Sequence, residues 1–391
     1  MENAQIKSFS KKQMVVVGGG FAGVEAAIQL RKKNYQVTLI SNRDYFFIYP
    51  ISIWIPVGKI PFEDSTLSLR KLADKHGFEL IIDELVNVHG ATNTVELKKQ
   101  KIQYDYLVIA VGAGKMKHKG LEHTFSICGQ PEQSLAMQKR FNELIAKGEG
   151  KIAIGFGGNP KDKSGVRGGP AFEIMFNMID KLKKKGLYQN FGFTFFAPMP
   201  EPGSRMGKSG YKMLDVMLAK EGIAKRVGKK ITGFEPNGIT LEDGSFIESD
   251  LTMFIPASDG LPLFQHSDLP LNEAGFIITD DHSKVFGFEN IYAVGDVAAM
   301  EGPDWKAKQG HMAVIMAKNA AYNIHQSVLG KPSCKGYQKH LNILCIMDTG
   351  DGAGFIYRKG DKDLFIPMPV VGHWLKKVWG WNYKLTRSLG I

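Results

Sequence analysis

The chain has 391 residues, of which 43% are hydrophobic and 23% charged, a composition that suits a globular enzyme and excludes intrinsic disorder. Lys and Arg outnumber Asp and Glu by 50 to 39, and this surplus favours an acidic partner such as anionic lipid, nucleic acid or a small anion. Three cysteines without a CxxC pair predict neither a disulfide scaffold nor a zinc site. Residues 1–12 lack the apolar core of a signal peptide, and no apolar run is long enough to predict a transmembrane helix.

The first motif is a glycine-rich turn between a short apolar strand, residues 14–17, and a helix expected over residues 24–30. The turn consists of Gly18, Gly19, Gly20, Phe21, Ala22 and Gly23. In this context Gly18 permits the tight turn, Gly20 lets the backbone approach a pyrophosphate, and Gly23 lets helix and strand pack closely. A phosphate is then expected at the helix N-terminus. The motif therefore predicts a dinucleotide-binding fold rather than a plain glycine turn.

The second strand, residues 36–40, is expected to end in an acidic residue that binds a ribose. Ser41 and Asn42 stand in that place, and Arg43 and Asp44 follow them. Either Ser41 or Asn42 bonds the ribose, or Asp44 reaches back to it. The uncharged segment that follows, residues 45–58, is interrupted by prolines and cannot cross a bilayer as a helix.

Two later segments point to FAD as the dinucleotide. Residues 106–113 form an apolar strand that ends in a small-residue turn containing Ala110 and Gly112, and this resembles the middle motif of FAD-dependent disulfide-reductase-like enzymes. Residues 290–296 resemble their late strand, in which the carboxylate of Asp296 accepts a hydrogen bond from the ribityl chain and Gly295 leaves room for it. The alternative role for Asp296 is the N-cap of a following helix.

A second strand–glycine motif begins at residues 151–156, but its glycines run into an insertion, residues 159–168, that carries a proline and several charges. A helix is expected to begin near Pro170. The sequence thus predicts a second dinucleotide fold whose NADH site is not favoured. We expect an α/β protein with two Rossmann-like domains, the second inserted in the first, and a C-terminal region. The expected boundaries are 1–118 and 269–330 for the FAD-binding domain, 119–268 for the second domain and 331–391 for the C-terminal region.

With these motifs placed, the chain resembles the sulfide:quinone oxidoreductase family, whose sister branches are flavocytochrome c sulfide dehydrogenases and type II NADH dehydrogenases. The resemblance rests on the FAD motifs, residues 43–46 with Pro50, and residues 169–173, 308–313 and 345–354, and on the basic aromatic C-terminus. It implies FAD as cofactor and cysteines that carry sulfane sulfur beside the flavin.

Cys128 and Cys345 stand where the family has its first and last cysteines, but Arg167 stands in the place of the middle one. The usual bridge between the middle and last cysteines cannot form. Cys345 therefore works alone, pairs with Cys128 or another thiol, or merely packs. Cys128 is a sulfur carrier, a thioether tether to the flavin or a structural thiol. Arg167 binds an anionic substrate, stabilises reduced flavin or is a plain surface residue.

The resemblance also implies roles for three further residues. Glu173 matches a glutamate near the flavin that exchanges a proton, although it also suits the first turn of a helix. Lys308 matches a lysine that stabilises negative charge on reduced flavin, and Gly310 begins a helix whose dipole acts in the same direction.

The C-terminus predicts a helix that lies in a membrane surface. Residues 374, 378, 381 and 385 form an apolar stripe that includes tryptophans. The basic residues of this stretch are Lys376, Lys377, Lys384 and Arg387. The alternative is a helix docked on the core or on a second copy of the chain. Nucleic acid is not expected as a partner, because the basic residues are otherwise scattered.

Together these patterns predict a monotopic, peripheral membrane flavoenzyme with FAD that moves two electrons from a sulfide-like donor to a quinone. The alternatives are an NADH or other donor:quinone reductase, a flavin subunit that passes electrons to a partner protein, and a sensor that keeps FAD without turnover. The sequence is compatible with both a single chain and a homo-oligomer.

Overall fold

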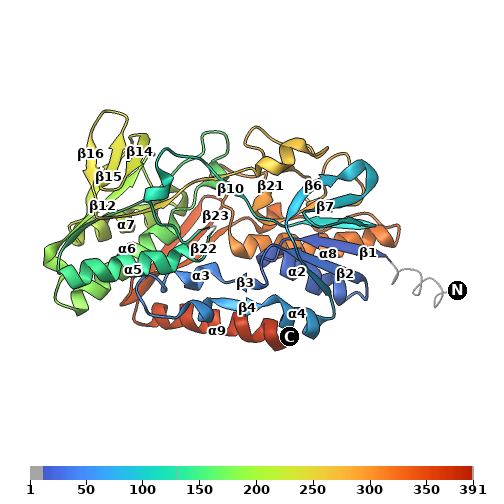
Figure 1. The fold of residues 1–391 in the computed structure, drawn as a ribbon, viewed down its shortest axis with the longest axis horizontal. Helices are drawn as coiled ribbons and strands as arrows, with labels where there is room; N and C mark the ends of the chain where they lie inside the picture. Colours follow the sequence, from blue (N-terminus) through green and yellow to red (C-terminus); the bar gives the residue numbers. More distant parts are fainter. Residues whose placement is uncertain (1–11, 129, 390–391) are drawn as a thin grey trace.

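The computed structural model describes residues 12–128 and 130–389, so most of the polar N-terminus lies outside the described residues. Two Rossmann-like α/β folds lie side by side along the molecule, and the C-terminal helix runs beneath them (Figure 1). The chain leaves the first sheet after β9 (Tyr106–Ile109), builds the second sheet, and returns to the first at β20 (Ile291–Ala293). The predicted fold class, with one dinucleotide fold inserted in the other, is confirmed.

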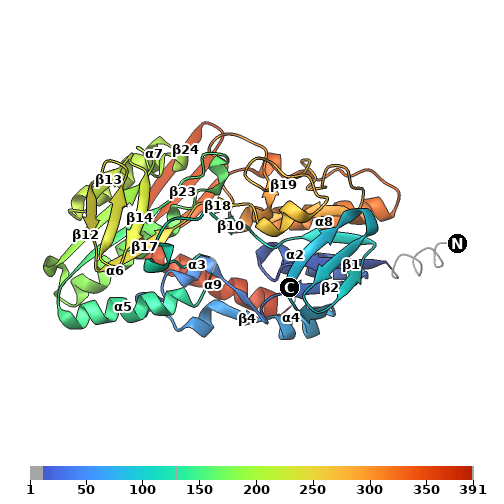
Figure 2. The same ribbon diagram turned by 45° about the horizontal axis from the view of Figure 1, so that its top comes forward.

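The first fold contains a parallel five-stranded sheet in the order β20-β9-β1-β2-β5. The remaining strands of this sheet are β1 (Gln13–Val17), β2 (Gln36–Ser41) and β5 (Glu79–Ile82). β1 is central because its apolar residues 14–17 are buried on both faces of the sheet. α2 (Phe21–Arg31) follows β1, and it packs against α8 (Gly310–Val328) beside the sheet (Figure 2).

Smaller elements flank this sheet. They are β3 (Tyr45–Phe47), α3 (Tyr49–Ser52), β4 (Thr66–Ser68), α4 (Leu69–His76), β6 (Leu85–His89), β7 (Thr94–Leu97), β8 (Lys101–Gln103), β19 (Ile277–Ile278) and β21 (Ala298–Ala299). The uncharged segment 45–58 forms β3, α3 and a series of turns, and its Ile53, Trp54 and Ile55 are buried. Its apolar character therefore reflects burial in the protein rather than exposure at the surface.

The second fold has a four-stranded parallel sheet in the order β13-β12-β11-β17 and a three-stranded antiparallel meander. Its elements are α5 (Gln133–Lys147), β11 (Gly150–Phe156), α6 (Gly169–Lys184), β12 (Phe191–Ala197), α7 (Lys208–Lys220), β13 (Ala224–Val227), β14 (Ile231–Glu235), β15 (Gly238–Leu241), β16 (Phe246–Glu248) and β17 (Leu251–Ile255). The helix predicted near Pro170 begins at Gly169, with the proline in its first turn.

A short antiparallel pair joins the two folds at the centre of the molecule (Figure 1). β10 (Gly114–Lys115) pairs with β18 (Ser258–Asp259), so the segments that follow β9 and β17 meet there. The carboxyl ends of parallel strands in open α/β sheets are where ligands bind. The crossing therefore places the loops of both folds around one central region.

The C-terminal region is an antiparallel sheet followed by a long helix. The sheet consists of β22 (Ile343–Asp348), β23 (Gly352–Lys359) and β24 (Lys362–Pro369), and the helix is α9 (Val371–Leu389). None of the helices among the described residues is long and apolar enough to cross a bilayer.

α9 lies on the protein with its polar side inward. Gly372, Lys376 and Gly380 are its buried residues, and a Cβ on Gly380 would lie 2.7 Å from Ile51 Cγ2. Glycine is thus used there for close approach, which explains why it interrupts an otherwise good helix. The predicted stripe points away from the core: its members Trp374, Val378, Trp381 and Leu385 are exposed by 60, 55, 66 and 37%.

The end of α9 contacts the start of the glycine-turn helix α2. Arg387 forms an ion pair with the buried Glu25 of α2. The ring of Tyr383 lies 5.3 Å from the ring of Phe21, the first residue of α2. The C-terminal helix is therefore attached directly to the predicted dinucleotide site.

Candidate active site

The glycine turn after β1 has the geometry that a dinucleotide needs. Gly18 adopts φ +120°, and a Cβ at that position would lie 2.2 Å from the Ala110 carbonyl oxygen. A Cβ on Gly23 would lie 1.7 Å from the Gly18 carbonyl oxygen, whereas a Cβ on Gly20 would meet no atom within 4 Å. A side chain at position 18 or 23 would collide with the protein's own backbone, whereas Gly20 borders open space. α2 begins at this space with no side-chain cap, which leaves its first N–H groups available to a phosphate.

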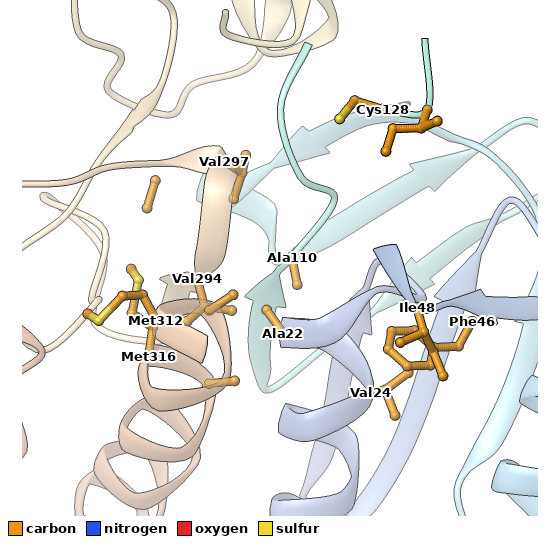
Figure 3. Close-up of a cluster of buried hydrophobic side chains, with 14 of the residues drawn as sticks. Ala22, Val24, Phe46, Ile48, Ala110, Cys128, Val294, Val297, Met312 and Met316 are labelled. Atoms are coloured by element: carbon orange, nitrogen blue, oxygen red, sulfur yellow. The ribbon is translucent and has the colours of Figure 1, made fainter. Parts of the chain in front are cut away.

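Small residues from three segments meet beside this turn. A Cβ on Gly295 would lie 3.3 Å from the Cβ atoms of Ala22 and Ala313. Figure 3 shows Ala22 of α2 and Ala110 after β9 near each other, with Val294 on the neighbouring segment. Gly112, with φ +77°, borders open space. Strand ends far apart in sequence therefore surround one space without large side chains in it.

On the ribose side, Ser41 and Asn42 are placed differently. Ser41 is buried at the end of β2, and its Oγ would lie 2.4 Å from a Cβ on Gly19. Asn42 and Asp44 are exposed, and Arg43 lies over the ring of Tyr45. Pro50 is in the first turn of α3. Among the alternatives for the ribose, Ser41 is the residue that contacts the glycine turn.

Asp296 forms an ion pair with Arg167, whose side chain comes from the loop before α6. Lys308 is buried nearby, donates to the Ala298 carbonyl oxygen, and lies 3.9 Å from the centre of the Phe276 ring. Burial lowers the pKa of Lys308 to about 8, although the charge of Asp296 opposes the shift. Asp296 and Lys308, predicted from separate motifs, are thus brought together, and Arg167 joins them.

Cys128 and Cys345 lie in different surroundings, and neither forms a disulfide in the described part of the chain. Cys128 is buried, and its charge would act on Tyr49 and Lys115. Burial raises the pKa of the Cys345 thiol to about 12, and the negative charge of Glu173 adds to the shift. At neutral pH the thiol of Cys345 is therefore protonated and a weak nucleophile.

Glu173 and Lys376 form a buried ion pair that connects α6 to α9. Glu173 Oε1 also accepts a hydrogen bond of 2.8 Å from the Asp348 amide, and Lys376 donates to the Ile346 carbonyl oxygen at 3.2 Å. Burial raises the pKa of Glu173, and the charge of Lys376 opposes this shift without cancelling it. A raised pKa makes this carboxyl group easier to protonate than an ordinary glutamate.

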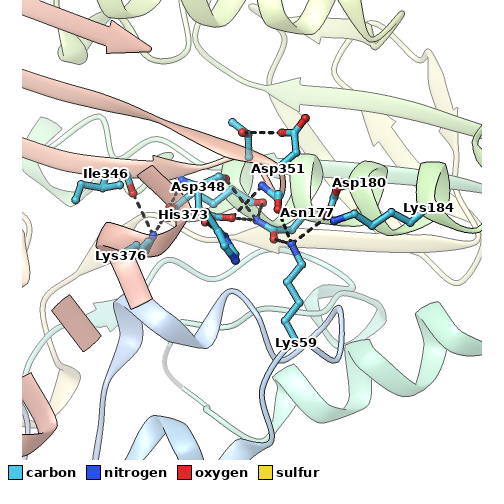
Figure 4. A network of polar contacts seen from close by, with 12 residues as sticks. Lys59, Asn177, Asp180, Lys184, Ile346, Asp348, Asp351, His373 and Lys376 are labelled. Carbon is cyan, nitrogen blue, oxygen red and sulfur yellow. Dashed lines mark hydrogen bonds and ion pairs between the residues drawn. The ribbon is translucent and has the colours of Figure 1, made fainter. Parts of the chain in front are cut away.

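A wider polar network continues from this pair (Figure 4). Asp348 accepts from Asn177 at 2.8 Å and pairs with His373 of α9 at 2.5 Å. Lys59 donates to Asn177 at 2.9 Å and pairs with Asp180 at 3.1 Å. Burial alone would raise the pKa of Asp348, but its hydrogen bonds from Asn177 and His373 lower it below the ordinary value. The network joins α6, β22 and α9 inside the protein.

The sequence reasoning missed most of this network. It placed Lys376 and Arg387 among the cations of a membrane-facing helix, whereas both side chains turn inward to carboxylates. Lys384 donates to the Asp64 carbonyl oxygen. The sequence did contain one signal of the inward orientation of Lys376, because this residue lies between Gly372 and Gly380 on the face opposite the tryptophans.

The second glycine run differs from the first. A loop of residues 157–168 separates β11 from α6, so no helix begins directly after Gly155, Gly157 and Gly158. Asn159 is buried in this loop and donates to the Ser258 carbonyl oxygen at 2.9 Å. The first turn of a helix, which would hold a second pyrophosphate, is displaced by the loop.

Three comparisons place the chain among known proteins. Residues 12–321 match the model of the family described as pyridine nucleotide-disulphide oxidoreductase. The sulfide-quinone reductase of Aquifex aeolicus is 30% identical over 371 residues, which cover 88% of this chain and 83% of that protein. The type II NADH:quinone oxidoreductase of Haemophilus influenzae is 24% identical and covers 82% of each chain. The solved structure of the Aquifex aeolicus sulfide:quinone oxidoreductase superposes with a TM-score of 0.86 at 26% identity, covering 97% of this chain and 92% of that one.

The residues around the first glycine turn fit FAD. Open space beside Gly20 and the free start of α2 suit its pyrophosphate, and the second oxygen of Asp296 remains available for a ribityl hydroxyl. Lys308 is buried beside Asp296 and would supply positive charge to a reduced ring.

Two alanine substitutions separate the roles of the glycines. Gly23→Ala should lower the free energy of unfolding by about 3 kcal/mol, because its Cβ collides with the backbone of Gly18. Gly20→Ala should leave the free energy of unfolding nearly unchanged but reduce FAD retention, because its methyl group enters the cofactor space. Urea unfolding and the ratio of flavin to protein absorbance measure the two effects. Full FAD retention in Gly20→Ala would contradict this placement.

The high pKa of Cys345 predicts slow alkylation. We expect its rate with iodoacetamide to keep rising up to about pH 10 without a plateau, because little thiolate exists below that pH. Glu173→Gln should move the curve to lower pH, since it removes a negative charge beside the thiol. Mass spectrometry of quenched samples gives both rates, with the exposed Cys334 as internal control. A plateau near neutral pH in the unsubstituted protein would refute the protonated thiol.

Proposed function

The chain belongs to the pyridine nucleotide-disulphide oxidoreductase family, in its sulfide:quinone oxidoreductase branch, and from this premise we propose that it passes two electrons from a reduced sulfur compound to a membrane quinone. It is an FAD-dependent oxidoreductase, and bound FAD supplies the two-electron relay between donor and acceptor. The donor, the quinone and the membrane are the parts of this function that the proposal adds.

The choice of a sulfur donor over NADH is carried by the loop after β11. In residues 157–168 the chain has only a short 3-10 turn, Lys163–Gly165, and no α-helix begins at the position where a nicotinamide dinucleotide would place its pyrophosphate. The 30% identity to a sulfide-quinone reductase over most of both chains supports the same choice. The similarity to a type II NADH:quinone oxidoreductase keeps NADH as the competing donor.

In this function we assign separate chemical roles to several residues of the chain. Oxidation of hydrosulfide to sulfane sulfur releases two electrons and one proton, and a quinone takes up two electrons and two protons. Cys128 and Cys345 are the candidate sulfur carriers, although the protonated thiol of Cys345 must first lose its proton, and Glu173 is the candidate proton holder. Lys308 stabilises negative charge near Asp296. Because Arg167 replaces the middle cysteine, each thiol acts without the usual bridge.

The donor is identified by mixing purified holoprotein with sulfide or NADH under argon and following flavin absorbance. We expect sulfide to bleach the flavin at least about a hundredfold faster than NADH, because no helix N-terminus holds the NADH phosphates. Cys345→Ser and Cys128→Ser should each slow the bleaching if both thiols carry sulfur. Unchanged bleaching in Cys345→Ser would remove that residue from the mechanism, and faster bleaching by NADH would overturn the choice of donor.

The outward face of α9 supports attachment to a membrane. Four exposed residues of its stripe, Trp374, Val378, Trp381 and Leu385, are apolar and face away from the protein. Leu364 and Ile366 of β24 are exposed as well. Contiguous exposed apolar surface with tryptophans is typical of a helix that lies in a lipid interface. We propose that this face lies in a membrane and that the quinone approaches the flavin from that side.

A charge on the stripe should release the protein from vesicles. Trp381→Glu should reduce binding to anionic liposomes by about tenfold or more, because each large apolar side chain contributes roughly 1.5–3 kcal/mol when buried in lipid. Phe286→Glu is the matched control, since Phe286 is also exposed but lies outside the C-terminal region. Co-sedimentation measures both variants, and equal binding would exclude α9 as the anchor. Loss of dimers instead of lipid binding would show that the face contacts a second copy.

A further inference from the structure

Arg167 has more hydrogen-bond donors than its partners use. Its Nη2 pairs with Asp296, while its Nε is buried without a hydrogen-bond partner among the described residues. A guanidinium group has five N–H donors in a planar fork, and a buried donor without an acceptor is unfavourable. The side chain is therefore suited to a second anionic partner besides Asp296.

The surroundings of Arg167 are positively charged. Its charge acts on Lys115 and on Lys308, both partly or fully buried. Cys128 lies in the same environment, since its charge would act on both Lys115 and Arg167. The carboxylate of Asp296 neutralises only one of the three positive charges, which belong to Arg167, Lys115 and Lys308. An anion entering this cluster gains electrostatic energy from the cations around it.

The backbone holds Arg167 and Lys115 close together. Lys115 of β10 is paired with Ser258 of β18. The loop that carries Arg167 packs on the same residue, because a Cβ on Gly165 would lie 2.5 Å from the Ser258 carbonyl oxygen. Asn159 fixes the beginning of this loop by donating to that oxygen at 2.9 Å. Two strand ends and one loop thus present both cations to the same region.

A surface cavity borders Lys115, one of the cations of this cluster. It has a volume of about 570 Å³, and its charged lining residues are Lys115, Lys117, Lys161, Asp259 and Glu273. Lys115 also lines a neighbouring cavity of about 320 Å³. Three lysines against two carboxylates leave one net positive charge at the mouth. That balance favours an anion at the mouth of the cavity.

We propose that Arg167, together with Lys115, binds a small sulfur-containing monoanion beside Cys128. Hydrosulfide and the thiolate of a small organic thiol share this chemistry. The identity of the ligand as electron donor depends on the proposed function, but the anion site itself does not. Arg167 would replace the missing thiol by holding the donor electrostatically instead of covalently.

The site is tested with thiocyanate, a sulfur-containing monoanion that does not reduce flavin. Oxidised holoprotein is titrated with it, and both flavin absorbance and calorimetry give the dissociation constant. Arg167→Met should weaken binding by at least about tenfold, because a hydrogen-bonded charge is lost. Arg167→Lys should retain part of the affinity, since a point charge remains without the fork. Lys115→Met should also weaken binding and reduce its dependence on salt.

Arg140→Met is the control for net charge, because Arg140 lies on α5 and is bonded to Asp250 and Glu143. Equal weakening in Arg140→Met and Arg167→Met, or unchanged affinity in both Arg167→Met and Lys115→Met, would overturn the site. The ratio of flavin to protein absorbance shows whether Arg167→Met still holds FAD. If it does not, Lys115→Met alone decides the outcome.

Electron donors of different charge distinguish inorganic sulfide from a small organic thiol as the source of the anion. Hydrosulfide, mercaptoacetate and neutral 2-mercaptoethanol are compared as reductants of the flavin under argon. Faster reduction by hydrosulfide assigns the site to inorganic sulfide, and faster reduction by mercaptoacetate assigns it to an organic thiol that carries a negative charge. Thiocyanate binding without reduction by any of them would refute the proposed function and leave the anion site standing. Preference for 2-mercaptoethanol that persists in Arg167→Met would refute the site.

Discussion

The buried ion pair between Glu173 and Lys376 is the interaction on which the C-terminal half of the structure depends. Separating two buried charges is costly, because the charge left without a partner remains out of water. The pair therefore fixes the rotation of α9 on the core. With Lys376 inward, the tryptophans on the opposite side face outward. The same carboxylate adds to the rise that burial causes in the pKa of Cys345, so the orientation of the exposed apolar face and the protonation of this thiol both involve one residue.

A second ion pair, between Arg167 and Asp296, plays a similar structural role at the centre of the molecule. It connects the loop of the inserted fold to the late strand end of the first fold. A cysteine in the place of Arg167 would offer covalent sulfur chemistry, whereas a guanidinium offers permanent positive charge. In the proposed function, Arg167 would hold the donor by its charge within the same fold.

Much of the fold was predictable, because the determining signals are local. The glycine turn at residues 18–23 and the helix at Pro170 follow from backbone geometry that only those residues adopt easily. The order of the strand motifs then predicted an inserted fold. The polar network around Asp348 and His373 was not predictable, because its members are far apart in the chain and have no common spacing. The sequence prediction for Lys376 was wrong because its partner Glu173 is far away in the chain, although the spacing of Lys376 from Gly372 and Gly380 indicated an inward face.

The sequence by itself determined a flavoprotein with two Rossmann-like folds, since turns, helix starts and apolar strands are encoded by neighbouring residues. It also determined that α9 carries an apolar stripe. Only the tertiary structure decided that the stripe faces outward, because the direction of a helix face depends on what lies beneath it. The structure likewise decided that Cys128 and Cys345 lie in different electrostatic surroundings. Burial and charge at a residue are sums over segments distant in sequence, and the fold alone brings those segments together.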